Sequence, residues 1–387
     1  QFRFLEDRTK VSITDRAFLA QAAVTVAAAG STTSVTFDTE GGASVDWLIP
    51  GMVVSIGEDD DSTAQPEWCT VRIESVVDSG AYSTATVRTI AAANGSTTAV
   101  DNNTKCTVIG TAFEEGSGAP DVWSQKLDHD YGYTQIFKTA AEMTNTSRAT
   151  VYRGYADEWQ RIWNLKLREH KVDIERAMLF GMRGQQNSIN YTDGIAGHII
   201  YNSQSQKEVG GGQLSYTEDK AYLKTNTAAQ WTYDDLLSDF EVIFDPARGG
   251  GSSKLGLASL PVISHFNQLG GNGFVAGSVA SETPYNLEKS TGSFGHRIMK
   301  IETVHGDLSL VREPLFRGSS AGFLCLVDLD HVSYRPLVGN GINRDTSITT
   351  NVQQADEDLR KDLILTEAGL EISLPETHAL INLEGLN

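Results

Sequence analysis

The sequence predicts an α+β protein that carries a separate, small all-β module close to its amino terminus. Short runs of β type, separated by turn dipeptides, fill the stretch from about residue 20 to residue 113. One long amphipathic helix follows a β-type run, and apolar runs of strand type close the chain. We therefore expect five parts: an arm 1–18, the β module 19–118, a strand and long helix 119–189, a mixed α/β part 190–345, and closing strands 346–387.

Composition places the chain among globular proteins and excludes several functions. Charged residues make up 21% of its 387 residues and apolar residues 40%, which is enough to bury cores in more than one domain. No run of 18 apolar residues occurs, so we expect no membrane span. The net charge of −19 argues against a protein that grips nucleic-acid phosphates. The start shows no signal pattern. Because it also lacks an initiator methionine, we expect that residues before Gln1 have been removed, either by processing or by the design of the expressed chain.

The first 118 residues divide into an arm and a β module. Residues 1–18 show no periodicity long enough to support an element, so we expect an extended polar arm. In the module, turn dipeptides such as Pro50-Gly51 and Ser79-Gly80 separate short β runs, which predicts a small barrel or sandwich. The runs are 24–26, 34–37, 52–56, 69–77, 83–90 and 106–110. From Leu19 to Gly118 there are 3 basic and 13 acidic residues, and this net charge of −10 marks a separate module.

The module has its own candidate core and two of the three cysteines. The predicted core residues are aromatic: Phe37, Trp47 and Trp68. Cys69, Cys106 and Cys325 cannot all pair with one another and show no metal-ligand spacing. Reduced structural thiols are the simplest interpretation, and a Cys69–Cys106 bridge within the module is the alternative.

The stretch from Arg153 to Gly181 predicts one helix of about thirty residues, roughly 45 Å long at 1.5 Å per residue. Its apolar side chains recur at steps of three and four residues and therefore share one face. The predicted core of this face is Trp159, Ile162, Trp163, Ile174, Ala177 and Met178. A helix of this length suits a strut packed along a sheet, and an ordinary core helix is the alternative.

The second half of the chain alternates helix and strand patterns. Residues 231–250 predict an amphipathic helix with Thr232 as its N-cap and Asp235 three residues further on. A strand is expected to run into another helix at Pro261, and strand-type stretches follow at 296–316 and 321–337. The tail contains two more β runs, which we expect to bend at Ala368-Gly369.

No motif predicts catalysis, a metal site or a cofactor site. Residues 249–255 resemble a phosphate-binding loop but lack its Gly-Lys-Ser/Thr end and follow a helix, so a surface loop is the better interpretation. The acidic run 58–61 lacks the glycine and the closing glutamate of a calcium loop. The histidines, among them His129, His170, His198, His265 and His296, show no metal-binding spacing. We expect His170 to be packed or capping, and we expect no enzyme activity.

Several stretches outside the module carry a resemblance to a known family. They are 133–149 (YTQIFKTAAEMTNTSRA), 166–181 (KLREHKVDIERAMLFG), 327–337 (VDLDHVSYRPL) and 358–372 (DLRKDLILTEAGLEI). A linker, Phe113-Glu-Glu-Gly116, also precedes the Tyr133-Thr-Gln135 strand. In these features the chain resembles the major capsid proteins of tailed bacteriophages with the Hong Kong 97-type fold. It is most similar to the family of major head proteins that includes the head protein of an enterobacterial podovirus.

The resemblance implies a structural protein that forms a shell. Residues 119–189 and 346–387 would form a peripheral domain with the long helix as its spine, and 190–345 the axial domain. The module 19–118 would be an insertion in the extended-loop region. Copies would assemble into hexamers and pentamers of an icosahedral shell around double-stranded DNA, without binding that DNA specifically. The implied partners are a portal protein and cement or decoration proteins, and the implied location is the virion, assembled in the host cytoplasm.

Two other functions fit parts of the sequence. An encapsulin-like compartment shell shares the implied fold, although the large β insertion is less expected there. A surface-binding β protein with a carbohydrate-binding module would explain the β module but not the long helix. Within the capsid interpretation, the acidic module is expected on the outer face, where it would bridge neighbouring capsomers. Passive surface decoration is the alternative.

Overall fold

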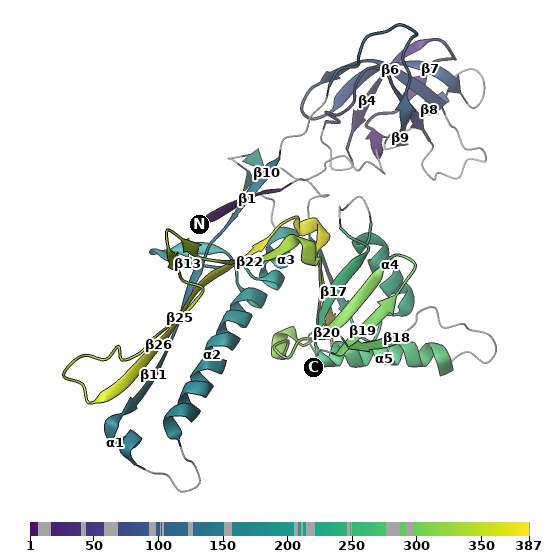
Figure 1. Cartoon of the computed structure of the whole chain (residues 1–387). Helices are drawn as coiled ribbons and strands as arrows, with labels where there is room; N and C mark the ends of the chain where they lie inside the picture. Colours follow the sequence, from purple (N-terminus) through teal and green to yellow (C-terminus); the bar gives the residue numbers. More distant parts are fainter. Residues whose placement is uncertain are drawn as a thin grey trace. The chain divides into compact units, whose positions relative to one another are not determined.

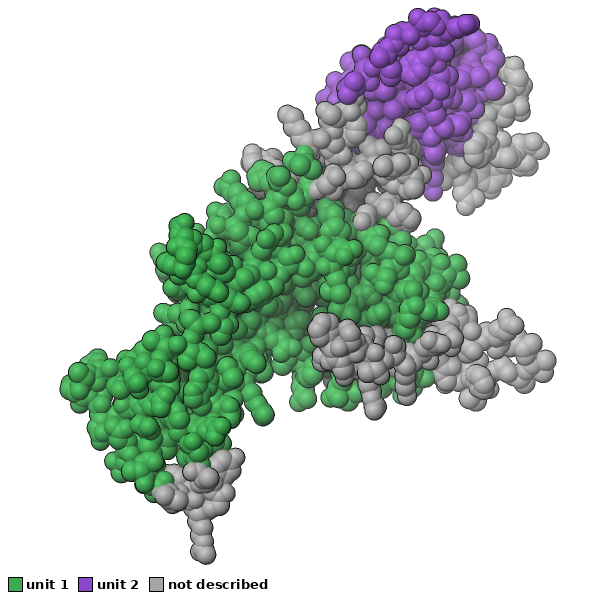
Figure 2. Space-filling view, viewed as in Figure 1, with its two compact units in different colours: residues 1–8, 127–207, 219–387 green, residues 9–126, 208–218 purple. Residues whose placement is uncertain are grey.

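The computed structural model describes the chain except for residues 7–16, 40–43, 58–68, 93–97, 101, 103, 123–126, 151–156, 205–207, 210–211, 214–220, 246–247, 249, 276–286, 292–296 and 387. The described chain divides into two compact units (Figure 2). Unit 1 consists of residues 1–8, 127–207 and 219–387, and unit 2 of residues 9–126 and 208–218. Helices and strands both occur in unit 1 (Figure 1), which confirms the α+β class.

Unit 2 is built around a closed β-barrel, which decides between the two architectures expected for the module. Around the barrel the strands follow the order β2, β4, β7, β6, β5 and β9, and neighbours are antiparallel. Their bounds are β2 Ala17–Ala20, β4 Thr32–Asp38, β5 Met52–Ile56, β6 Cys69–Asp78, β7 Ser83–Ala92 and β9 Thr104–Thr111. Two smaller pairs join β3 Val24–Val26 to β8 Thr98–Val100, and β14 Glu208–Val209 to β15 Gly212–Gln213. Closure pairs both sides of every barrel strand, so the module needs no partner sheet.

Alternate residues of the barrel strands point inward and form one apolar core. Phe18 meets Phe37 and Trp47 edge to face there, with ring centroids 4.9 Å and 5.6 Å apart. Phe37 and Trp47 are therefore part of this core, whereas Trp68 lies outside the described residues. The acidic run 58–61 also lies outside them.

The barrel separates the two cysteines for which a bridge was the alternative. Cys69 on β6 and Cys106 on β9 each lie opposite Ile56, which stands between them on β5. Neighbouring strands are about 4.8 Å apart, so two strand spacings exceed the ~7 Å between Cα atoms that a disulfide tolerates. Both thiols are buried and free, as is that of Cys325 in unit 1.

The expected arm 1–18 is not one element. Strand β1, Phe2–Glu6, pairs antiparallel with β10, Asp128–Gly132, and we refer to this pair as the ribbon. Residues 7–16 lie outside the described part of the chain, and 17–18 already belong to barrel strand β2. A paired strand at residues 2–6 was not expected, because the sequence of β10, DHDYG, is too polar to be recognised as its partner.

A long antiparallel sheet carries the long helix of unit 1. Strand β26, Leu359–Ile372, pairs with β11, Gln135–Thr144, along one edge and with β22, Val332–Pro336, and β25, Thr346–Thr349, along the other. Helix α2, Glu158–Phe180, packs along β11 and β26 (Figure 1). The short helix α1, Asn145–Ala149, follows β11. The connection from β22 to β25 contains a hairpin of β23, Val338–Gly339, and β24, Ile342–Asn343.

Strand β26 is continuous through Ala368 and Gly369, where a bend was expected. Its 14 residues pair first with β11 and then with β22. Gly369 serves a close approach instead, because a Cβ atom there would lie 2.5 Å from the carbonyl oxygen of Tyr133. The glycine therefore marks a place where two backbones meet and not a turn.

Seven of the described strands form a mixed sheet in the order β16, β27, β21, β17, β20, β19 and β18. Their bounds are β16 Tyr222–Thr227, β17 Ser253–Ala258, β18 Leu287–Thr291, β19 Arg297–Glu302, β20 Asp307–Arg312, β21 Phe323–Val327 and β27 Ala379–Glu384. The helices of this part are α3 Ile195–Gln204, α4 Tyr233–Ile243 and α5 Leu260–Val275. Short elements are the pair β12 Gly184–Gln186 and β13 Ile189–Tyr191, and the 3-10 turns η2 Gly318–Ser320, η3 Leu329–His331 and η4 Pro375–Thr377.

The two faces of the seven-stranded sheet pack against different helices. Side chains of α4 and α5 join one face in a core with Leu324 and Leu326 of β21. The intervening Cys325 and Val327 point to the other face and pack with α3 and the end of α2. The predicted capping box of Thr232 and Asp235 opens α4, and α5 begins one residue before Pro261.

The sheets do not divide at residue 345, where we expected a boundary. Strand β22 belongs to the four-stranded sheet, although it lies before residue 345. Strand β27, expected among the closing strands beside the long helix, lies inside the seven-stranded sheet between β16 and β21. Its near-continuous apolar run, ALINL, is typical of a strand that is covered on both faces.

Candidate functional site

Neither a metal site nor a membrane span is found in the part of the chain that the structure describes. No group of three or more His, Cys, Asp or Glu side chains there could hold a metal ion. No helix among the described residues is long and apolar enough to cross a membrane. Unit 1 offers three other features: a buried polar joint, an apolar pocket, and exposed apolar side chains on paired strands.

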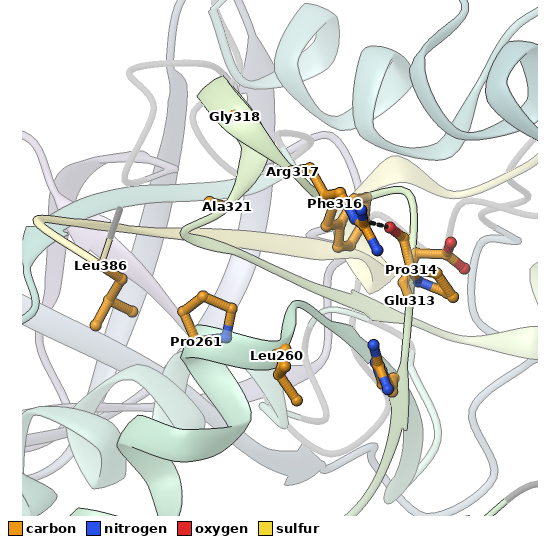
Figure 3. Close-up of a pocket in the computed structure, with 10 residues that line it drawn as sticks. Leu260, Pro261, Glu313, Pro314, Phe316, Arg317, Gly318, Ala321 and Leu386 are labelled. Carbon is orange, nitrogen blue, oxygen red and sulfur yellow. Dashed lines mark hydrogen bonds between the residues drawn. The ribbon is translucent and has the colours of Figure 1, made fainter.

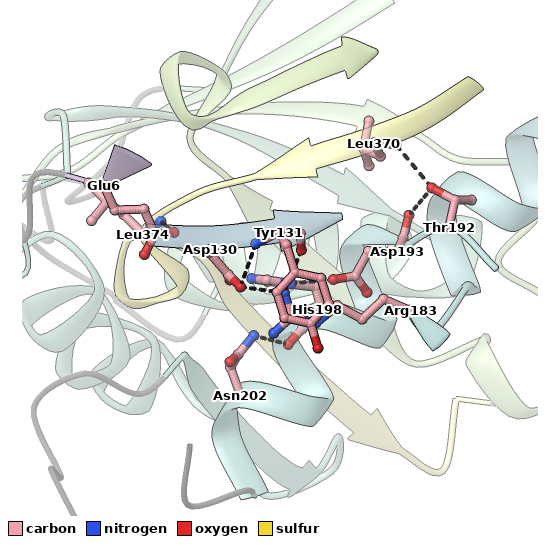
Figure 4. Close-up of polar contacts among 10 residues, drawn as sticks. All are labelled: Glu6, Asp130, Tyr131, Arg183, Thr192, Asp193, His198, Asn202, Leu370 and Leu374. Carbon is pink, nitrogen blue, oxygen red and sulfur yellow. Dashed lines mark hydrogen bonds and ion pairs between the residues drawn. The ribbon is translucent and has the colours of Figure 1, made fainter. Parts of the chain in front are cut away.

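A buried polar joint attaches the ribbon to the end of α2 (Figure 4). Arg183, which follows α2, donates hydrogen bonds to Asp130 Oδ1 at 2.7 Å and to the Tyr131 carbonyl oxygen at 2.9 Å. Its guanidinium also lies 4.8 Å from the centre of the Tyr131 ring. Burial alone would lower the pKa of Arg183, but Asp130 and Asp193 raise it above its ordinary value. A buried ion pair thus fixes the direction in which the ribbon leaves the helix.

The same joint includes the far end of β26. The backbone N–H of Leu370 donates a hydrogen bond to the Thr192 hydroxyl at 3.0 Å. Just after β26, the N–H of Leu374 donates to Glu6 Oε1 of the ribbon at 3.2 Å. Leu374 adopts a left-handed conformation with φ of 50°, which turns the chain into η4. Figure 4 shows these groups arriving from elements far apart in the sequence.

Two buried imidazoles near α3 and η4 each have one nitrogen without a partner. His198 Nδ1 lies 2.6 Å from Asp193 Oδ2, so this nitrogen donates its proton to the carboxylate. His378 Nδ1 accepts a hydrogen bond from the Asp328 N–H at 3.2 Å, so in the neutral ring Nε2 carries the proton. Neither Nε2 atom has a hydrogen-bond partner among the described residues. Burial, with His198 and Lys254 close by, lowers the pKa of His378 to about 3.

Unit 1 is expected to lose stability in acid because of His378. Its pKa is about 3 in the folded chain against 6.5 for an ordinary histidine, so below 6.5 the unfolded chain binds a proton that the folded chain does not. The free energy of unfolding should therefore fall by about 1.4 kcal/mol per pH unit as the pH drops from 6.5 toward 3. Urea titrations at several pH values measure this slope.

Two substitutions test the attribution to His378. His378→Asn should flatten the slope by one proton, because asparagine does not titrate in this range. His305→Asn, at an exposed position, is the matched control. A slope that stays the same in His378→Asn would contradict the attribution.

Lys254, in the stretch that resembles a phosphate-binding loop, faces the protein interior from β17. Its Nζ donates a hydrogen bond to the Thr377 carbonyl oxygen at 2.7 Å and lies 3.9 Å from Asp328 Oδ2. Burial lowers the pKa of Lys254 to about 8, although Asp328 opposes this shift. Lys254 therefore ties η4 to the sheet and does not present its charge to a phosphate.

An apolar pocket of about 460 Å³ lies where α5 begins and β20 ends (Figure 3). It is lined by Leu260, Pro261, Arg312, Glu313, Pro314, Phe316, Arg317, Gly318, Ala321 and Leu386. Glu313 accepts a hydrogen bond from the Leu315 N–H at 2.9 Å, and burial raises its pKa. Because apolar side chains dominate the lining, the pocket is suited to binding and not to acid–base chemistry.

Paired strands of unit 1 expose apolar side chains. On the ribbon, Leu5 is 68% exposed. On the hairpin β23–β24, Val338 is 60% and Ile342 62% exposed. Exposed apolar groups that gather on projecting elements commonly mark contacts with other proteins. The ribbon and this hairpin are therefore candidate interfaces.

The predicted apolar face of the long helix is only partly covered. None of its six predicted core residues is fully buried in unit 1, and all are intermediate in exposure: Trp159, Ile162, Trp163, Ile174, Ala177 and Met178. The buried residues of α2 are His170 and Leu179. His170 bridges the sheet, with the hydroxyls of Thr139 and Thr366 each 2.9 Å from a ring nitrogen. The strands that face the helix present hydroxyl groups, and His170 makes hydrogen bonds to them at a position where an apolar contact was expected. His170 is therefore packed.

The described start of the long helix lies inside its predicted range. Helix α2 begins at Glu158, and Asp157 caps it by accepting a hydrogen bond from the Gln160 N–H at 3.1 Å. The predicted start at Arg153 lies outside the described residues. Trp159 reaches the sheet near this end, where the Arg360 guanidinium lies 4.8 Å from the centre of its ring.

Two of the other histidines named from the sequence lie on different elements. His129 is on β10 of the ribbon. His265 is on α5 and stacks on Trp231, with ring centroids 6.0 Å apart. His296 lies outside the described residues.

No local pattern predicts the joint, whereas one local pattern does predict a buried charge. Asp130 and Arg183 are 53 residues apart, and no spacing rule connects them. Lys254, however, shares the inward phase of β17 with Gly256 and Ala258. A lysine in the buried phase of an alternating strand indicates a paired buried charge, because an unpaired one would be too costly.

The chain matches known proteins over most of its length. A family model described as SU10 major capsid protein matches residues 16–386. The major capsid protein of Pseudomonas phage PaMx41 is 26% identical over 237 residues, which cover 59% of this chain and 51% of that protein. The chain thus spans about half the length of that curated relative.

Solved structures with some likeness include structures from phages and an encapsulin complex. A structure from Mycobacterium phage Patience is 14% identical, with 71% of this chain and 78% of that chain covered and a TM-score of 0.41. The mature capsid of bacteriophage PhiM1 is 10% identical, with coverages of 72% and 80% and a TM-score of 0.43. The SrpI encapsulin of Synechococcus elongatus PCC 7942 is 12% identical, with coverages of 68% and 77% and a TM-score of 0.41. These TM-scores are too low to carry a conclusion about this chain, whereas the family model covers nearly all of it.

The chain belongs to the SU10 major capsid protein family.

Proposed function

We propose that copies of this chain assemble into hexamers and pentamers of an icosahedral shell that encloses the double-stranded DNA of a tailed phage. Beyond family membership, one observation supports this most directly: the ribbon and the β23–β24 hairpin expose apolar side chains. Burying apolar surface favours association by about 25 cal/mol per Å². In a capsid protein the partner that covers such surfaces is another copy of the chain.

The order of elements supports a Hong Kong 97-type arrangement. Helix α2 would be the spine helix, and the four-stranded sheet beside it the rest of the peripheral domain. The seven-stranded sheet with its helices would be the axial domain. The ribbon would be the base of the extended loop, and the barrel the module inserted in that loop. This assignment moves β22 to the peripheral domain and β27 to the axial domain.

The shell would hold DNA without gripping it. A net charge of −19 repels phosphates, so packaged DNA would stay mobile inside. We propose a portal protein and cement or decoration proteins as further partners, assembly in the host cytoplasm, and no enzyme activity. The barrel would lie on the outer face of the shell, where its acidic surface stays away from the DNA.

Replacing Val338 and Ile342 together with aspartate is expected to stop assembly without unfolding the chain. Both side chains are exposed in the single chain, so the new charges remain hydrated there, whereas an apolar contact with another copy would bury them unpaired. Sedimentation velocity should show particles for the parent chain and slow species for the variant, with equal melting temperatures. Val304→Asp, at an exposed turn between β19 and β20, is the matched control. If the double variant forms normal particles, the hairpin is not an interface.

A further inference from the structure

The pocket at the start of α5 combines an apolar wall with a basic rim (Figure 3). Leu260, Pro261 and Leu386 contribute apolar surface, and Leu260 is 53% exposed. Arg312 and Arg317 are exposed at the rim, and no ion pair to either is found among the described residues. Among the described residues, the hydrogen-bond partner of the Arg317 side chain is the Pro314 carbonyl oxygen, at 3.0 Å. The pocket is thus suited to bind a segment that has apolar side chains and negative charge.

One segment of the chain has this chemistry and is exposed throughout. Residues 114–122, EEGSGAPDV, follow the barrel, and every one of them is exposed. We call them the acidic linker. It carries three carboxylates, on Glu114, Glu115 and Asp121, and no basic residue. At its end Pro120 and Val122 offer apolar surface, and Val122 is 90% exposed.

We propose that the acidic linker of one copy docks in the pocket of a second copy. Val122 and Pro120 would cover the apolar wall, and Asp121 would approach Arg312 and Arg317. In a chain with a net charge of −19, surfaces of two copies mostly repel each other, so paired arginines favour the one segment that brings carboxylates. The proposal rests on shell assembly, which would keep the linker of a neighbouring copy at millimolar effective concentration beside the pocket.

Cysteine cross-linking tests the contact directly, because the native thiols of Cys69, Cys106 and Cys325 are buried. One chain carries Val122→Cys and the other Leu260→Cys, and the two are co-expressed and oxidised as particles. The expected result is a disulfide-linked dimer on non-reducing gels in the mixture and in neither chain alone. Asn164→Cys, on the exposed side of α2, replaces Leu260→Cys as the control and should give no dimer. Particles without a dimer, although both new thiols react with maleimide, would overturn the docking and leave shell assembly intact.

A chain that carries both Val122→Cys and Leu260→Cys distinguishes docking of a second copy's linker from docking of the chain's own linker. Docking between copies gives a ladder of linked chains, whereas an internal disulfide gives a single chain of faster mobility and would contradict the proposal. If electron microscopy of the same sample shows no particles at all, the proposal of shell assembly itself is contradicted.

Charge reversal provides a test that does not depend on cysteine geometry. Arg317→Glu should slow dimer formation about two- to fivefold, the effect of losing one exposed ion pair. Asp121→Arg in the partner chain should restore it, because the pair is then reformed with opposite polarity. Arg168→Glu, at an exposed position of α2, should leave the rate unchanged. Equal rates in Arg317→Glu and Arg168→Glu would show that the basic rim plays no part.

Discussion

Replacing Arg183 with leucine is expected to lower the free energy of unfolding of unit 1 by about 3–5 kcal/mol. The substitution removes the ion pair between Arg183 and Asp130, whose side chain is only 5% exposed. The loss should appear in urea denaturation followed by the fluorescence of tryptophans in unit 1. Because the joint sets the direction of the ribbon, particles should also form poorly under conditions in which the subunit remains folded.

The Arg183 prediction has a matched control and a partial rescue. Arg161 pairs with Glu158 on the exposed surface of α2, so Arg161→Leu should cost less than about 1 kcal/mol. Adding Asp130→Leu to Arg183→Leu should recover part of the loss, since a carboxylate is then no longer buried beside an apolar side chain. Equal losses for Arg161→Leu and Arg183→Leu would show that the joint is not a source of stability.

Excising the barrel is expected to leave unit 1 folded but to weaken the particles. Residues 17–111 would be replaced by Gly-Ser, which is feasible because Glu6 and Asp128, the inner ends of the ribbon, lie opposite each other. Unit 1 should keep its melting temperature, since the barrel has its own core and its strands close on themselves. If the barrel bridges neighbouring capsomers, particles should form in lower yield and burst at lower temperature and higher salt.

Particle robustness decides between the two roles considered for the barrel. Parent and excised particles are compared by dynamic light scattering during heating, at low and at high salt. Particles of unchanged robustness would show that the barrel is a passive surface decoration. The isolated segment 17–111 serves as a control, because it should melt cooperatively by itself if the barrel is an independent domain.

Local patterns predicted most elements of the fold. The barrel strands followed from β runs between turn dipeptides, and β5, Met52–Ile56, has the predicted bounds. The start of α4 followed from Thr232 and Asp235, whose side chains and backbones meet within one turn. These features depend on residues near each other in the chain, and such interactions can be read from spacing.

The features that the sequence did not reveal depend on contacts between distant segments. Strand β1 exists only because it pairs with the polar β10, more than 120 residues later in the chain. The centre of the long helix is set by His170, whose partner Thr366 is 196 residues away. The near-continuous apolar run of β27 indicates a strand covered on both faces, but it does not indicate which strands pair with it. Tertiary pairing decided these cases, and no local preference indicates it.

The central claim is that this chain forms a closed shell from copies of itself. Electron microscopy of the purified chain, expressed without other phage proteins, tests it most directly. The account predicts closed particles built of hexamers and pentamers, in which the ribbon and the β23–β24 hairpin lie at contacts between copies. Particles built around a cargo protein would favour the compartment alternative, and a chain that remains monomeric at high concentration would contradict the account.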